Sequence, residues 1–163
     1  RKVYVRFRYP SEKYKGKLQL RFFNLEDETR TGESMLITTP DGINMLIDAG
    51  IKKVGPQVID YLKKLKVEKL DYIVVSHFHS DHIGGMAAVV GEFDVDKIMM
   101  CEMPYNTTLK KELDEAVLRK NCEVIYLKEG DFFKLGDEVE IEILNPQAEI
   151  VSGDWQLRKH LFC

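Results

Sequence analysis

Apolar residues follow two different periods along this chain of 163 residues, and the order of the two periods constrains its fold. Up to about residue 50 they lie in short strand-like runs. The turn sequence Pro40-Asp41-Gly42 joins two of these runs, which predicts a hairpin over residues 35–48. From residue 54 onward, segments with helical spacing and short apolar runs take turns. This order predicts a layered α/β domain in which antiparallel strands come first and β–α units follow.

The individual elements can be located from the same patterns. Strands are expected over residues 3–9, 17–23, 71–76, 97–103 and 122–127, and a second hairpin over residues 132–143 around Gly136-Asp137. Helices are expected from Val54 to about Leu65, from Ile83 to Val90, and from Thr107 or Thr108 to about Lys120.

Length and composition indicate one globular domain that spans residues 1–163. Hydrophobic residues make up 44% of the chain and charged residues 31%, which argues against intrinsic disorder. No apolar run approaches the roughly 20 residues of a membrane-spanning helix. The chain begins at Arg1 without an apolar signal segment, so we expect a cytoplasmic protein. It also begins without a methionine, which leaves a longer, secreted or membrane-tethered parent open.

Basic residues are concentrated at the start of the chain. Residues 1–21 carry eight basic side chains and one acidic side chain, whereas the whole chain has a net charge of −3. A basic arm on an acidic body can bind a polyanion such as a nucleic acid backbone. The alternation of these basic residues with Val3, Val5 and Phe7 favours instead an edge hairpin whose charged side chains face solvent.

Three of the four histidines fall within six residues, together with an aspartate: His77, His79, Asp81 and His82. They follow a buried strand and precede a helix, and α/β folds place their sites at such strand ends. Residues two apart in an extended chain point the same way, so His77 and His79 can bind one ion together. The turn into the helix directs Asp81 and His82 toward a second ion. The alternative is a solvent-exposed histidine-rich turn without metal. The three cysteines lack the CxxC spacing of a thiolate site and show no pairing pattern of a disulfide scaffold.

The run from His77 to His82 resembles the signature of the metallo-β-lactamase fold superfamily. Further matches are Leu46-Ile47-Asp48-Ala49-Gly50, the strand over residues 70–76, and Ile83-Gly84-Gly85 at the helix start. Thr39-Pro40-Asp41-Gly42 and the helical segment 61–65 resemble most closely the ComEC-type competence hydrolases of this superfamily. The resemblance extends from about Leu18 to Pro146.

The resemblance implies an αββα sandwich with the metal ions at one edge of its strand layers. It implies a hydrolase in which a metal-bound hydroxide attacks an ester-type bond, with a small-molecule or nucleic-acid phosphodiester as the favoured substrate. The cofactor would be one or two zinc ions, with manganese or iron as alternatives. His77 and His79 would bind the first ion, and Asp81 and His82 the second. Asp81 would also be catalytic, and Asp48 would support the site without binding metal.

Two departures from the family pattern affect these expectations. Residues 28–34 stand where the ComEC-type branch has a Gly-Gln-Gly-Asp-like segment. The family also takes a histidine, a bridging aspartate and a last histidine from its second half, whereas His160 is the only histidine here after His82. We therefore expect an incomplete sandwich whose second half is missing, in which Asp154 and His160 are tail residues rather than ligands. A homodimer that covers the missing half is expected. The alternative function is a truncated or degenerate, non-catalytic metal-binding or assembly module.

Overall fold

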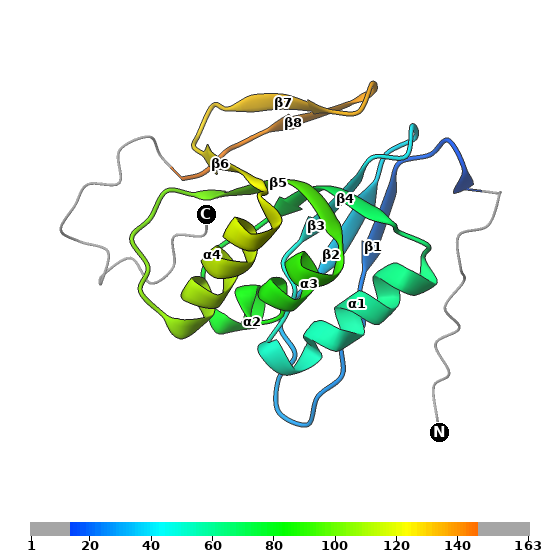
Figure 1. The fold of residues 1–163 in the computed structure, drawn as a ribbon. Helices are drawn as coiled ribbons and strands as arrows, with labels where there is room; N and C mark the ends of the chain where they lie inside the picture. Colours follow the sequence, from blue (N-terminus) through cyan, green and yellow to red (C-terminus); the bar gives the residue numbers. More distant parts are fainter. Residues whose placement is uncertain (1–13, 147–163) are drawn as a thin grey trace.

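The computed structural model describes residues 14–146 of the chain. Its centre is a six-stranded sheet in the order β1 to β6 (Figure 1). The strands are β1 (Gln19–Phe22), β2 (Met35–Thr38), β3 (Asn44–Ile47), β4 (Lys69–Val74), β5 (Asp94–Cys101) and β6 (Glu123–Leu127). The predicted strand over residues 3–9, and with it most of the basic arm, lies outside the described residues, as do Asp154 and His160.

Strand direction changes at β3. β1, β2 and β3 pair antiparallel, and the register that sets Met35 opposite Ile47 confirms the hairpin predicted around Pro40-Asp41-Gly42. β3 to β6 pair parallel, and a helical segment connects each of these strands to the next. The predicted order, with antiparallel strands before β–α units, is therefore confirmed. Because the parallel strands end at one edge of the sheet, the loops that follow them meet there.

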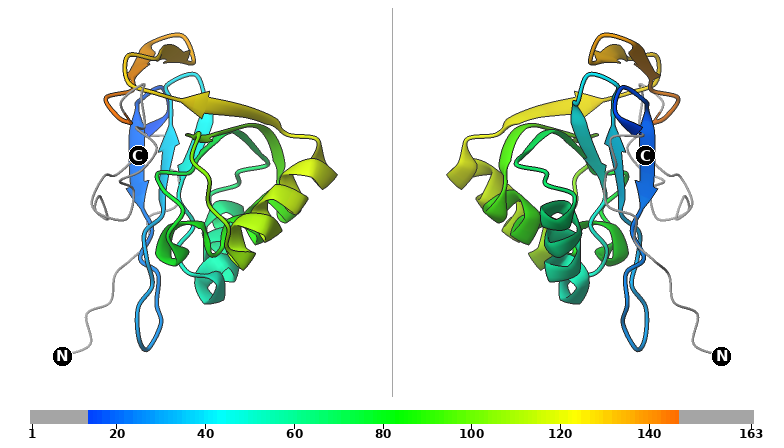
Figure 2. Two further views of the ribbon diagram at one scale, coloured as in Figure 1. Left: turned by 90° about the vertical axis from the view of Figure 1, so that its left-hand side faces the viewer. Right: turned by 90° about the vertical axis from the view of Figure 1, so that its right-hand side faces the viewer.

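The helices cover one face of the sheet (Figures 1 and 2). They are the 3-10 turn η2 (Lys52–Val54), α1 (Gly55–Lys64), α2 (Ser80–Ile83), α3 (Met86–Glu92) and α4 (Thr108–Lys120). The Thr107 side chain accepts a hydrogen bond from the Lys110 N–H, so Thr107 is the N-cap residue of α4. None of the helices within residues 14–146 has the length and apolar character to traverse a bilayer.

The helix predicted over residues 83–90 is confirmed from Met86 onward, but it does not extend back to Ile83. α2 ends at Ile83 and α3 begins at Met86, with Gly84 and Gly85 between them. The chain passes very close to other backbone here. A methyl carbon on Gly85 would collide with the Ala49 carbonyl oxygen and lie 2.7 Å from the Cα atom of Gly55. Two residues without side chains allow this approach, and the chain divides into two short helices around it.

The main core lies between the sheet and the helices. Leu36, Leu46, Ile73 and Ile98 are fully buried on this side of four neighbouring strands. The helices contribute buried side chains to the same cluster, among them Val58, Leu62, Met86, Val89 and Leu113. Cys101 at the end of β5 is buried and disulfide-bonded, which the spacing of the cysteines did not indicate, whereas Cys122 is a free thiol.

The opposite face of the sheet is also apolar, and a hairpin packs against it. β7 (Phe132–Leu135) and β8 (Val139–Glu142) pair antiparallel, which confirms the second predicted hairpin. Leu135 is buried with Ile37, Met45 and Met99 of the sheet. At the other end of this face, on β1, Leu20 is 56% exposed and Phe22 is 77% exposed. The described chain thus forms one helical layer, one sheet and a hairpin on the second face, which agrees with the predicted α/β class.

The backbone contact at Gly85 is expected to be intolerant of a side chain. We predict that Gly85→Ala lowers the free energy of unfolding by about 1–3 kcal/mol, because the added methyl group would overlap backbone atoms, which cannot move aside as a flexible side chain could. Urea-induced unfolding measures this change. The control is Gly91→Ala in α3, where nothing lies within 4 Å of the added methyl carbon. It should be neutral or stabilising, by up to about 1 kcal/mol. An equal effect of the two substitutions would contradict the argument.

Candidate metal centre

The predicted site residues lie at the edge where β3 and β4 end. Asp48 follows β3, and its N–H donates to the Val74 carbonyl oxygen over 3.1 Å, which continues the pairing of the two strands. The loop after β4 carries His77 and His79 and leads into α2, which contains Asp81 and His82. The Ala49 N–H donates to the His82 carbonyl oxygen over 2.8 Å, so the two segments are also joined beyond the strands.

Asp48 is the buried hydrogen-bond acceptor of the site. Its residue is only 3% exposed, and its backbone has the left-handed φ of 57°. One carboxylate oxygen accepts a hydrogen bond of 2.9 Å from the Ser76 N–H. The other accepts a short hydrogen bond from the Ser76 hydroxyl and one of 2.7 Å from His82 Nδ1. Asp48 therefore contacts His82, which is the supporting position that the resemblance implies.

These hydrogen bonds decide which nitrogens of two histidines carry a proton. A carboxylate only accepts, so His82 Nδ1 donates and His82 Nε2 keeps its lone pair in the neutral ring. The Ser76 hydroxyl gives its one hydrogen to Asp48 and therefore accepts from His77 Nδ1, which lies 3.1 Å away. His77 Nε2 is left with a lone pair in the same way. In both neutral rings Nε2 is thus the nitrogen without a proton, which is the form in which imidazole binds a metal ion.

The three imidazoles are close neighbours. The ring centroids of His77 and His82 are 3.8 Å apart, and those of His77 and His79 are 4.7 Å apart. Burial is the main cause that lowers the pKa of His77, and the nearby His82 and His79 rings lower it further. His77 is therefore held neutral, which is the form that binds a metal ion.

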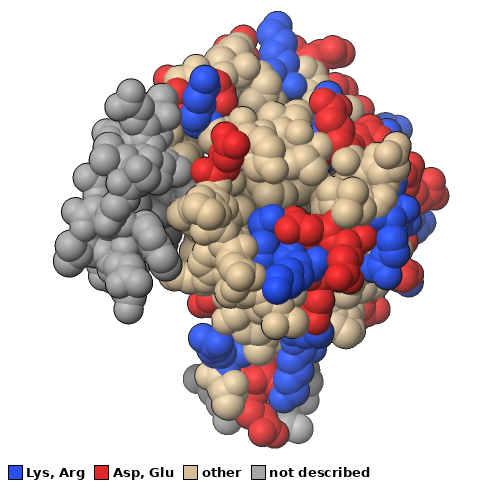
Figure 3. All heavy atoms as spheres, turned by 60° about the vertical axis from the view of Figure 1, so that its left-hand side comes forward, with Lys and Arg blue, Asp and Glu red and all other residues tan. Residues whose placement is uncertain are grey.

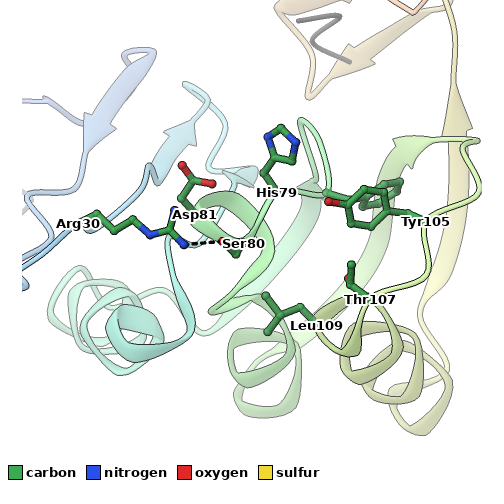
Figure 4. A pocket seen from close by; sticks show the side chains of 8 residues that line it. Arg30, His79, Ser80, Asp81, Tyr105, Thr107 and Leu109 are labelled. Atoms are coloured by element: carbon green, nitrogen blue, oxygen red, sulfur yellow. Dashed lines mark hydrogen bonds between the residues drawn. The ribbon is translucent and has the colours of Figure 1, made fainter. Parts of the chain in front are cut away.

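His79 and Asp81 lie on the side of the site that faces a pocket. His79 is exposed, and both side chains line a pocket of about 400 Å³ (Figure 4). Three imidazoles and a carboxylate are the donor types that zinc, manganese and iron accept. As the side chains stand, residues 14–146 contain no group of three or more His, Cys, Asp or Glu in an arrangement that could hold a metal ion. The donor chemistry fits such an ion, and the assignment of these four residues as ligands stays a prediction.

Sequence reasoning missed three residues of the site, namely Ser76, Arg30 and Tyr105. Ser76 lies next to His77 in the sequence, so the run itself contained a signal for it. Arg30 donates to the Ser80 hydroxyl over 2.9 Å from 50 residues away, and Tyr105 comes from the loop after β5. No local pattern connects these two residues to the histidines.

A family model described as the metallo-beta-lactamase superfamily matches residues 28–151, which is more than half of the chain. Two curated proteins are similar over shorter stretches. The chain is 32% identical over 73 residues to the endoribonuclease YSH1 of Kluyveromyces lactis, and the match covers 44% of this chain and 10% of that protein. It is 33% identical over 86 residues to a beta-lactamase-like protein 2 homolog of Caenorhabditis elegans, covering 45% of this chain and 27% of that protein. The chain thus spans about a quarter or less of these relatives.

Solved structures agree on the fold. The chain superimposes with a TM-score of 0.53 on a metallo-beta-lactamase superfamily protein of the archaeon Sulfolobus tokodaii, at 17% identity, covering 77% of this chain and 54% of that one. It also superimposes with a TM-score of 0.53 on the rubredoxin oxygen:oxidoreductase of Desulfovibrio gigas, at 18% identity, covering 72% of this chain and 31% of that one.

The acceptor role of Asp48 can be tested by a single-atom change. We predict that Asp48→Asn lowers the free energy of unfolding by about 1–3 kcal/mol, because the new amide group donates where three donors already converge. We also expect zinc affinity to fall about 10- to 100-fold, since His82 loses the partner that orients it. Urea unfolding and zinc titration measure the two effects. Asp114→Asn on the exposed side of α4 is the control. Unchanged stability and affinity in Asp48→Asn would contradict the assigned role.

Proposed function

Since the chain belongs to the metallo-beta-lactamase superfamily, we propose that it is a metal-dependent hydrolase whose metal centre is formed by His77, His79, Asp81 and His82. The observation that carries this proposal is the hydrogen-bond chain from His82 through Asp48 and Ser76 to His77. A buried carboxylate with three donors holds two imidazoles in one tautomer, and an ordinary surface turn has no need of that arrangement.

The ligands divide into two pairs in this proposal. His77 and His79 bind one ion, and Asp81 and His82 bind a second ion or complete the first. A divalent ion at this place supplies a Lewis acid and activates water near neutral pH. Two protein donors for an ion would leave room for water and substrate to bind it as well.

The surrounding residues have separate tasks. Asp48 and Ser76 fix the ring orientations and keep Nε2 of both rings deprotonated. Asp81 faces the pocket, and its carboxylate can take the proton of a water molecule that attacks an ester-type bond there. Phe78 lies between His77 and His79 in the chain but is buried, so it anchors the loop in the core.

For the substrate we favour a phosphodiester. One similar protein is named an endoribonuclease, although the match covers 10% of its length. The ComEC-like segments at residues 39–42 and 61–65 favour the same chemistry, and membership of that branch stays a prediction.

The homodimer expected from the sequence stays a proposal. It is supported by the exposed Leu20 and Phe22, which share a face with Ile37 and Met35 of β2. Contiguous apolar surface of this kind is typical of an interaction site. A second copy placed on this face would cover it.

The metal centre is tested by metal content. We predict near-stoichiometric zinc, manganese or iron in the purified chain, measured by mass spectrometry, and loss of it in His79→Ala. His160→Ala replaces the remaining histidine and should keep the metal. With added Zn²⁺ or Mn²⁺, the parent chain should hydrolyse bis(p-nitrophenyl) phosphate and His79→Ala should not. A parent chain without metal would favour the alternative of a non-catalytic module.

The dimer is tested by light scattering at working concentration. We predict twice the monomer mass for the parent chain and a shift toward the monomer for Phe22→Gln, because that change removes the largest exposed apolar side chain of the face. Leu118→Gln replaces an equally exposed residue on α4 and should leave the mass unchanged. A monomeric parent chain would exclude the dimer.

A further inference from the structure

The pocket beside His79 has a charged end and an apolar end. Arg30 comes from the loop before β2, His79 and Asp81 from the loop after β4 and from α2, and Tyr105 from the loop after β5, and the pocket is completed by Thr107 and Leu109 at the start of α4. In Figure 4 the Arg30 guanidinium lies beside Ser80 and Asp81, Tyr105 lies at the opposite end, and His79 stands between the two ends. A volume of about 400 Å³ is within the range of small-molecule sites.

Backbone contacts hold the loop of Arg30 in this position. The Ile51 N–H donates to the Thr31 carbonyl oxygen over 2.9 Å, and the Glu33 N–H donates to the Asp81 carbonyl oxygen over 3.2 Å. Gly32 between them has a φ of 77°, and a methyl carbon there would collide with the Asp81 carbonyl oxygen. The close approach of these two backbones therefore places Arg30 at the rim of the pocket.

Arg30 and Lys110 differ in the partners that their charged groups have. Lys110 lies 5.2 Å from the centroid of the Phe78 ring, but Asp114 pairs with its charge at 2.6 Å. Arg30 forms no ion pair with a carboxylate of residues 14–146, and its hydrogen-bond partner there is the neutral Ser80 hydroxyl. A guanidinium has five N–H donors, so most of them stay available.

The Ser80 contact is weak enough to be replaced. A phosphate carries the opposite charge to the guanidinium and can accept two parallel N–H···O hydrogen bonds from it, whereas the Ser80 hydroxyl offers one neutral oxygen. The attraction of an anion to this pocket would come from nearby charges. On the face shown in Figure 3, Lys and Arg side chains are interspersed with Asp and Glu instead of forming one basic patch. An anion in the pocket would thus be attracted by Arg30 itself.

The other end of the pocket suits a flat or apolar group. Phe78 is buried and its ring lies 5.5 Å from the half-buried Tyr105 ring, with an angle of 36° between the two planes. Leu109 adds an aliphatic side chain to the pocket lining, between Ser80 and Thr107 in Figure 4. Aromatic side chains of this kind stack on nucleobases and tolerate any base.

We propose that this pocket binds a nucleotide phosphate ester, with the phosphate oxygens on the Arg30 guanidinium and the nucleoside against Tyr105 and Leu109. The inference rests on the proposed function and narrows it, because the bound phosphate then lies beside His79. Arg30 is a substrate-binding residue in this arrangement and needs no metal ion for its own contact.

The test is calorimetric binding of adenosine 5′-monophosphate and of adenosine to the full chain, with the metal content of every sample measured. We predict that Arg30→Gln weakens binding of the monophosphate about 10- to 100-fold, the range of a lost charge-assisted hydrogen bond. Binding of adenosine should not change. The affinity of Arg30→Lys for the monophosphate should lie between those of the parent chain and Arg30→Gln, since lysine keeps the charge but lacks the planar guanidinium. Tyr105→Ala should weaken both ligands.

Arg119→Gln is the matched control, because it removes an exposed arginine near the end of α4. The inference is overturned if the parent chain does not bind the monophosphate, if Arg30→Gln binds it as tightly as the parent, or if Arg119→Gln loses as much affinity. Metal content keeps the two proposals separate. If the parent chain holds metal and Arg30→Gln still binds the monophosphate as tightly as the parent, the nucleotide site is refuted but the hydrolase is not. If the parent chain holds no metal and Arg30→Gln loses affinity for the monophosphate, the hydrolase alone is refuted.

Discussion

The arrangement of the site depends on one buried carboxylate. Asp48 accepts hydrogen bonds from the Ser76 N–H and the Ser76 hydroxyl in the loop after β4, and from His82 Nδ1 in α2. A carboxylate buried without such partners would be strongly unfavourable, so its burial and the position of the histidines require each other. The parallel pairing of β3 with β4 makes this possible, because it brings the residues that follow both strands to the same edge.

The two faces of the sheet differ in how much of their apolar surface the described residues bury. The helical face is complete, since fully buried side chains of four strands pack against fully buried side chains of the helices. The second face has the same alternation of apolar residues, but the β7–β8 hairpin buries only part of it. Apolar surface contributes roughly 25 cal/mol per Å² when it is removed from water. Covering Leu20 and Phe22 with further protein would therefore add to the stability of this face.

Most elements could be predicted from the sequence because their causes are local. Short apolar runs on either side of Pro40-Asp41-Gly42 placed β2 and β3, and alternating apolar residues placed the β7–β8 hairpin. Helical spacing placed α1, and the side chain of Thr107 placed the start of α4. The helix expected over residues 83–90 is present from Met86 onward as α3, but the break before it has a distant cause. Gly84 and Gly85 look like weak points of one helix, and only the position of Ala49 and Gly55 shows why two helices form. The cysteine spacing likewise gave no sign that Cys101 is disulfide-bonded.

The candidate site divides in the same way. The sequence alone determined its set of side chains, because His77, His79, Asp81 and His82 lie within six residues at a strand-to-helix turn, and their role as metal ligands stays a prediction. It also indicated Asp48 through a resemblance. Only the tertiary structure decided which atoms of Asp48 and Ser76 hold the rings, and that Arg30 and Tyr105 face each other across His79. These side chains come from loops that are far apart in sequence. Their contacts follow from strand order and from backbone packing at Gly32, which no local pattern of residues expresses.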